Sequence, residues 1–240
     1  MSLYEILFIL VIFLSNIVQT VTGFAGTVLA MPFSIELVGE AVAKPVLNVV
    51  AIGVCLFIVI MHFKEIDWKL FLKMIVFIGI GFAAGIGLSY LPHDARLFLK
   101  IYGAVVVAIG VLFLIIPPER MKLPDWALYT ILVLGGVLHA LYISGGPLVI
   151  IFATIKIKDK HAFRATLSAI WVVLNSILLG QQGMNGMLTA QVGWLILIGG
   201  GVTLASIIIG HFLAKYMPKK AFMIATYILL IVSGVTLLIK

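Results

Sequence analysis

The sequence predicts an all-α integral membrane protein with two homologous halves, which we interpret as inverted repeats. Of its 240 residues, 63% are apolar and 10% are charged, whereas soluble domains carry about a quarter charged residues. Apolar stretches of about 20 residues recur along the whole chain, and each is long enough to cross ~30 Å of hydrocarbon as a helix. Two of these stretches are interrupted by glycines at corresponding places in the two halves.

Seven or eight apolar segments follow one another, and we expect each of them to be helical. They comprise residues 3–37, 42–62, 68–90, 95–116, 126–156, 162–180, 189–214 and 220–239. The first contains Gly23 and Gly26 near its middle, and the fifth contains Gly145, Gly146 and Pro147. Because helices tend to break at such residues, each of these two segments is expected to consist of two shorter helices.

A polar, proline-rich link separates the halves, and its last residue, Asp125, is expected to cap the following helix. We therefore expect an N-terminal membrane repeat over residues 1–116, a linker over 117–125 and a C-terminal membrane repeat over 126–240. Each repeat would contain one glycine-broken segment and three transmembrane helices.

A shift of 120 residues relates the two halves. It pairs four positions of interest: Gln19 with His139, Gly26 with Gly146, Lys44 with Arg164, and Asn48 with Ser168. Identity over this stretch is low. Duplicated membrane proteins with interrupted helices at corresponding places are nevertheless typical of secondary transporters, whose sites lie between the repeats.

The loops predict the orientation. Basic residues crowd the connections around residues 156–164 and 215–220, whereas the stretch 181–191 carries no charge. By the positive-inside rule the two basic connections are cytoplasmic, in a multi-pass protein of a prokaryotic inner membrane. More basic residues lie inside if the broken segments re-enter and leave on one side than if they cross fully, which favours inverted over parallel halves.

The two breaks are the candidate binding site. Its residues are Thr22, Gly23, Phe24, Ala25, Gly26 and Thr27 at the first break, and Tyr142, Ser144, Gly145, Gly146 and Pro147 at the second. A helix that begins inside the membrane presents unpaired N–H groups and a partial positive charge, both of which a small anion near the bilayer midplane would satisfy. The alternative is that the glycines only allow close helix packing.

Further polar and charged positions lie near the breaks. They are Gln19, Lys44, Asn48, His139, Arg164 and Ser168. Lys44 and Arg164 begin the helix after each break, where they would attract an anion or anchor the helix at the interface. His139 is a candidate proton carrier, or else a packed histidine, and Asn48 and Ser168 are either ligands or interhelical contacts.

No enzyme motif is present, so we expect a transporter without cofactor, metal site or catalytic residues. Two alternatives remain: a membrane-embedded enzyme that uses His139 and His211, and an assembly subunit that transports nothing. The single cysteine, Cys55, excludes a disulfide framework and is interpreted as a small packed residue.

The two breaks resemble those of the TauE/SafE, or sulfite exporter, family. The resemblance rests on Gly23–Phe24–Ala25–Gly26 with Pro32, on Ser144 to Val149, and on Phe163 to Leu167. It implies export of sulfite, sulfoacetate or other small sulfonates and organic acids. Thr27 stands where the family often has a denser glycine run, so the substrate itself is not carried over. The expected partners are a small anion and the lipid bilayer, with no nucleic acid and with homo-oligomerisation left open.

Overall fold

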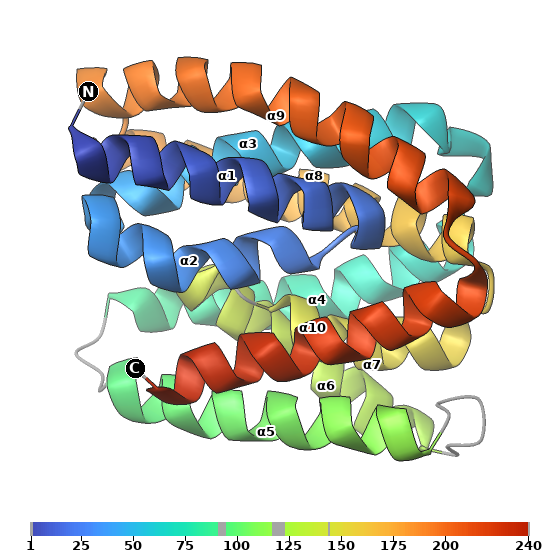
Figure 1. Cartoon of the computed structure of the whole chain (residues 1–240). Helices are drawn as coiled ribbons and strands as arrows, with labels where there is room; N and C mark the ends of the chain where they lie inside the picture. Colours follow the sequence, from blue (N-terminus) through green and yellow to red (C-terminus); the bar gives the residue numbers. More distant parts are fainter. Residues whose placement is uncertain (1, 91–94, 117–122, 144, 240) are drawn as a thin grey trace. The chain divides into compact units, whose positions relative to one another are not determined.

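A computed structural model describes residues 2–90, 95–116, 123–143 and 145–239 (Figure 1). These residues form α-helices and one short 3-10 turn, and no strand occurs among them, which confirms the all-α prediction. Five of the described helices are long and apolar enough to cross a membrane. They are Leu3–Thr22, Glu40–Met61, Trp68–Ser89, Lys160–Met184 and Ala190–Tyr216.

The chain divides into two compact units. Unit 1 comprises Met1–Ile66 and Arg164–Met217. Its elements are α1 (Leu3–Thr22), α2 (Ala25–Val38), α3 (Glu40–Met61), the 3-10 turn η1 (Phe63–Glu65), α8 (Lys160–Met184) from Arg164 onward, and α9 (Ala190–Tyr216). Helix α1 packs against α2, α3 and α9.

Unit 2 comprises Asp67–Phe163 and Pro218–Lys240. Its helices are α4 (Trp68–Ser89), α5 (Ala95–Ile115), α6 (Asp125–Tyr142), α7 (Gly146–Lys156) and α10 (Lys219–Ile239). Helix α4 packs against α6, α6 also packs against α7, and α5 lies alongside α10 (Figure 1).

Both predicted helix breaks are confirmed. Helix α1 ends at Thr22 and α2 begins at Ala25, while α6 ends at Tyr142 and α7 begins at Gly146. Gly23 and Ile143 follow the first helix of each pair and have left-handed φ angles of 85° and 54°. Their amides donate to the carbonyl oxygens four residues earlier, those of Gln19 and His139. The two breaks thus terminate a helix in the same way, 120 residues apart.

The burial of side chains repeats with the same offset. Buried, half-buried and exposed positions follow in identical order along residues 8–19 and 128–139. Residues 51–60 and 171–180 also share one order, with a single difference between Phe57 and Ile177. Corresponding helices of the two predicted halves therefore bury corresponding sides, which supports a duplicated chain.

In unit 1, polar side chains join α1 to α9. Asn16 Nδ2 donates to Thr203 Oγ1 at 2.9 Å, and Ser206 Oγ donates to the carbonyl of Phe13 at 2.9 Å. All four residues lie within α1 or α9, two apolar helices long enough to cross a membrane. Little water is therefore expected to compete for these hydrogen-bonding groups. Helix α9 belongs to the predicted second half and α1 to the first.

In unit 2, α4 and α6 approach each other through glycines. A Cβ atom on Gly81 would lie 1.8 Å from the carbonyl oxygen of Val133, and one on Gly136 would lie 2.1 Å from that of Ile78. Only glycine allows two helix backbones to approach this closely. Helix α4 belongs to the predicted first half and α6 to the second, so each unit combines helices of both halves. The repeat boundaries and the inverted arrangement stay predictions, and residues 117–122 of the expected linker lie outside the described residues.

The expected capping role of Asp125 is wrong. Helix α6 begins at Asp125 itself, and Pro124 occupies the N-cap position without a side-chain hydrogen bond. The Asp125 carboxylate instead accepts a hydrogen bond from Lys156 Nζ, at 3.0 Å, at the end of α7. A carboxylate in the first turn still interacts favourably with the positive end of the helix dipole.

Candidate functional site

Side chains from α1 bind the backbone amides at the first break. Thr22 Oγ1 accepts hydrogen bonds from the amides of Phe24 at 3.3 Å and Ala25 at 3.2 Å. Gln19 Oε1 accepts from the amide of Gly26 at 2.8 Å. The backbone amides at the start of α2 therefore donate hydrogen bonds to side chains of α1.

These hydrogen bonds correct the expectation of unpaired amides at the first break. It is wrong for Phe24, Ala25 and Gly26, because Thr22 and Gln19 reach across the break. The Thr22 hydroxyl also donates to the carbonyl of Val18 at 2.8 Å, so its hydrogen is not free to bind an anion as we expected. Thr27, the last residue assigned to this break, is half-buried in the first turn of α2.

Arg164 of α8 lies at the first break. Its Nη2 donates to the carbonyl oxygen of Thr20, in the last turn of α1. The Arg164 backbone adjoins Gly23, where an added Cβ would lie 3.3 Å from both the Arg164 Cα and carbonyl oxygen. The side chain is 2% exposed, and its Nε has no hydrogen-bond partner. Arg164 thus lies against the turn that connects α1 to α2.

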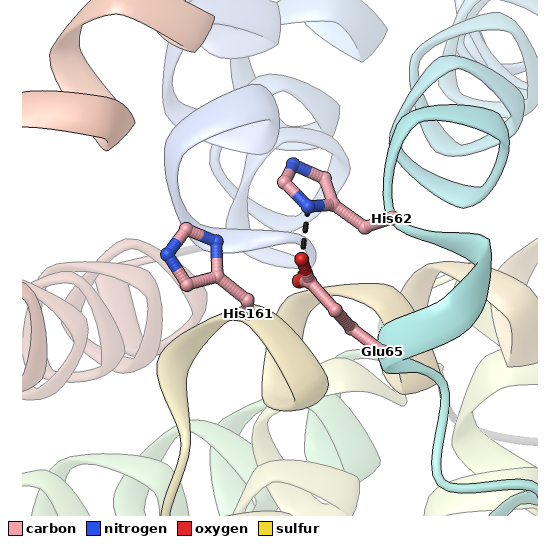
Figure 2. A group of neighbouring side chains, drawn as sticks. All are labelled: His62, Glu65 and His161. Atoms are coloured by element: carbon pink, nitrogen blue, oxygen red, sulfur yellow. Dashed lines mark hydrogen bonds and ion pairs between the residues drawn. The ribbon is translucent and has the colours of Figure 1, made fainter.

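No described carboxylate forms an ion pair with Arg164. Glu65 is the acid that acts on it through space, and that carboxylate is hydrogen-bonded to His62 Nδ1 at 3.0 Å (Figure 2). A buried cation without a counterion is costly, because the interior replaces little of its hydration energy. The arrangement therefore favours a negatively charged guest beside Arg164.

Gln19, Cys55 and Ser168 extend the polar surroundings of this break. Gln19 Nε2 donates to Cys55 Sγ at 3.4 Å, and the Cys55 thiol lies near Ser168. The Ser168 side chain is 0% exposed, and its hydroxyl has no hydrogen-bond partner among the described residues. We call Gln19, Gly26, Cys55, Arg164 and Ser168 the first-break cluster; all five belong to unit 1.

Cys55 is a member that the sequence analysis missed. It was interpreted as a packed residue, and it is indeed fully buried. A signal was nevertheless present, because Cys55 follows Asn48 by seven residues and such a spacing places two side chains on one face of a helix. Thr20, whose carbonyl binds Arg164, carried no comparable signal.

Lys44, the sequence counterpart of Arg164, has different surroundings. Its ammonium group forms an ion pair with Glu40, one turn earlier on α3, and its side chain is 21% exposed. An exposed pair of this kind contributes little stability and little net charge. The shift of 120 residues therefore pairs one compensated cation with one that is buried without a carboxylate.

Asn48 connects α3 with α8. Its Nδ2 donates to the carbonyl of Asn175 at 3.0 Å and to Gln182 Oε1 at 3.1 Å. Asn48, Asn175 and Gln182 are all buried. The structure thus gives Asn48 an interhelical contact, which was one of its two expected roles.

At the second break, Gly145 is packed against α6. A Cβ atom there would lie 2.1 Å from the carbonyl oxygen of Gly135 and 2.7 Å from His139 Cβ. Gly146 and Pro147 are buried at the start of α7, which has no side-chain cap, and Pro147 has no amide hydrogen to offer. Ser144 lies outside the described residues, as does the side chain of Tyr142.

Gly145 rather than Gly146 makes the contacts that correspond to those of Gly26. A Cβ atom on Gly26 would lie 2.5 Å from the carbonyl oxygen of Ser15 and 2.6 Å from Gln19 Cβ. Because Gln19 corresponds to His139, the second connection is one residue shorter than the first. A constant shift along the sequence does not detect this deletion. Close packing requires glycine at both positions, as the packing alternative proposed.

The two histidines singled out by the sequence are packed against aromatic rings. His139 is 3% exposed, and its ring centroid lies 6.0 Å from that of Phe82 within unit 2. His211 meets Phe57 edge-on at 5.8 Å and lies 6.5 Å from the His62 ring, all within unit 1. These contacts fit the expectation of packed histidines.

Comparison with known proteins identifies relatives of the chain. A family model described as "Sulfite exporter TauE/SafE" matches residues 8–237. The "Probable inner membrane transporter protein TsaS" of Comamonas testosteroni is 25% identical over 182 residues, which cover 74% of each chain. No solved structure matches the chain.

Proposed function

This chain belongs to the sulfite exporter TauE/SafE family, whose members are membrane transporters and not enzymes, and on this basis we propose the following substrates. It exports small anions, namely sulfite, sulfoacetate or other sulfonates and organic acids. We place the protein in a prokaryotic inner membrane, because its relative from Comamonas testosteroni is named as a probable inner membrane transporter protein. Since the sequence has no P-loop, the proposed driving force is a gradient or is supplied by a partner.

The observation that carries this proposal is that Arg164 is buried and forms no ion pair with a carboxylate in the part of the chain that the structure describes. Charged side chains within membrane-spanning segments are rare and usually mark the path of an ion or a substrate. A guanidinium also matches the oxygen atoms of a sulfonate or carboxylate, to which it can donate two parallel hydrogen bonds. The first-break cluster is therefore the proposed anion site.

The remaining residues of the two breaks stay proposed contributors near the bilayer midplane. At the first break the free donors are fewer than the sequence suggests, because Thr22 and Gln19 take up three amides. At the second break, α7 begins without a side-chain cap, which agrees with a role of Gly146 in anion binding. A proton-carrying role for His139 also stays a proposal.

Transport by purified protein in liposomes tests the proposal, with sulfite and methanesulfonate as substrates. Arg164→Gln is expected to reduce flux by roughly tenfold or more, the factor that corresponds to about 1.4 kcal/mol of lost binding. Lys44→Gln is the matched control, and its flux should stay within about twofold because Glu40 already compensates that charge. Equal flux in both variants would refute the role of Arg164, provided that thermal unfolding shows both to be folded.

A competing proposal is an assembly subunit that transports nothing. The close packing of Gly26 and Gly145 favours it, since packing alone then explains both glycines. Absence of anion flux in the wild-type liposomes, with intact folding, would support this alternative. Loss of flux in Gly146→Leu with preserved stability would count against it.

A further inference from the structure

Two buried donors that have no hydrogen-bond partner among the described residues lie one turn apart on α8. They are Nε of Arg164 and Oγ of Ser168, in side chains that are 2% and 0% exposed. Residues four apart on a helix project from the same face, so both donors can serve one small ligand. Burying two donors without acceptors costs free energy, and a ligand with several oxygen atoms recovers it.

The surroundings supply a single positive charge. Besides Arg164, the first-break cluster contains only neutral side chains: those of Gln19, Cys55 and Ser168, with Gly26. Nη2 of Arg164 donates to the Thr20 carbonyl oxygen, which carries a partial negative charge. Glu65 also opposes additional negative charge from a distance.

From these charges we propose that the first-break cluster binds one singly charged oxyanion headgroup, a sulfonate or bisulfite, held by Arg164 and Ser168. The proposal rests on the proposed transport function and names its substrate class. A headgroup with one negative charge neutralises Arg164, whereas a headgroup with two, such as the sulfite dianion or sulfate, leaves one charge buried without compensation. In an interior of low dielectric constant that difference is large compared with the free energy of one hydrogen bond. The second charge of sulfoacetate is on its carboxylate, outside the headgroup.

Sulfite provides a direct test, because it exchanges between monoanion and dianion near neutral pH. At fixed total sulfite, flux into liposomes should fall by about tenfold for each pH unit once the dianion predominates. Methanesulfonate is a monoanion throughout this range, and its flux should stay within about twofold. It thereby controls for titration of the groups near the site, namely Glu65, His62 and Cys55. Sulfate, a dianion throughout, should neither be transported nor compete.

The outcomes separate the two proposals. Methanesulfonate flux together with sulfite flux that is constant or rises with pH would overturn the monoanion site and leave the transport function standing. Sulfate transport would do the same. Absence of flux for both sulfite and methanesulfonate would overturn the transport function and this inference with it.

Ser168→Ala tests the second donor. It should raise the KM for methanesulfonate by roughly tenfold and leave the midpoint of thermal unfolding unchanged or higher, since among the described residues the hydroxyl has only the Cys55 thiol, a weak hydrogen-bonding group, beside it. Ser206→Ala is the matched control, because that hydroxyl donates to the helix carbonyls of Phe13 and Val202. The control should lower the unfolding midpoint without changing KM. An unchanged KM in a folded Ser168→Ala protein would remove Ser168 from the site and overturn the proposal.

Discussion

Gly23 and Arg164 are separated by 141 positions in the sequence and are in direct backbone proximity in the fold. A Cβ atom at residue 23 would lie 3.3 Å from both the Cα and the carbonyl oxygen of Arg164. Gly23 also has a φ of 85°, which disfavours a side chain even in open space. One glycine thus both ends α1 and admits the buried arginine.

Gly23→Ala should lower the free energy of unfolding and also impair transport. The left-handed conformation alone costs about 1–2 kcal/mol with a Cβ atom, and the contact with Arg164 adds to this. Gly186→Ala is the control, since Gly186 has a φ of 70° but no atom within 4 Å of its added Cβ. Thermal unfolding in detergent and anion flux are the measurements. Equal effects of both substitutions would show that the Arg164 contact contributes nothing.

Gln19→Leu should destabilise the protein by about 1–3 kcal/mol, because it leaves the buried amide of Gly26 without an acceptor. The contact with Cys55 Sγ is lost as well. Gln191→Leu serves as the control: its amide donates to Glu5 at an exposed position, where a lost hydrogen bond costs little. The comparison uses chemical or thermal unfolding of both variants. Similar stabilities would mean that the first break does not depend on Gln19.

The hydrogen bond between Asn16 and Thr203 should appear as a coupling free energy between α1 and α9. Double-mutant cycles of such bonds between membrane helices average about 0.6 kcal/mol. The single variants Asn16→Leu and Thr203→Val and their combination complete the cycle. We expect a coupling of about 0.5–1.5 kcal/mol in unfolding experiments. A coupling of zero within error would contradict this contact.

Cys55 is the single cysteine of the chain and therefore a native reporter for the first-break cluster. Its thiol is fully buried beside Gln19, so modification by N-ethylmaleimide should be slow and should require opening of the site. Bound methanesulfonate should slow the modification further in the wild type. In Arg164→Gln this protection should be lost, which mass spectrometry would measure. Protection that persists in Arg164→Gln would place the anion elsewhere.

The sequence predicts the helices and their breaks well because these depend on local chemistry. Hydropathy identifies the segments that cross hydrocarbon, and the glycines at 23 and 145 mark where a backbone must turn or be approached closely. Even the hydrogen bonds of Thr22 follow a local rule, since Ser and Thr hydroxyls commonly accept from backbone amides two or three residues later. By that rule Thr22, and not an anion, is the acceptor for the amides of Phe24 and Ala25.

The composition of the candidate site depended on the tertiary structure. Lys44 and Arg164 occupy corresponding places in the two halves. The sequence places Glu40 one helical turn before Lys44 and Lys160 one turn before Arg164, but it does not indicate the distant neighbours of Arg164. Packing does distinguish them, because Lys44 lies one turn from Glu40, whereas Arg164 lies beside Thr20 and Gly23 of a distant segment. Whether a charge is compensated is a property of its spatial neighbours, and for Arg164 these neighbours are more than 140 residues away in the chain.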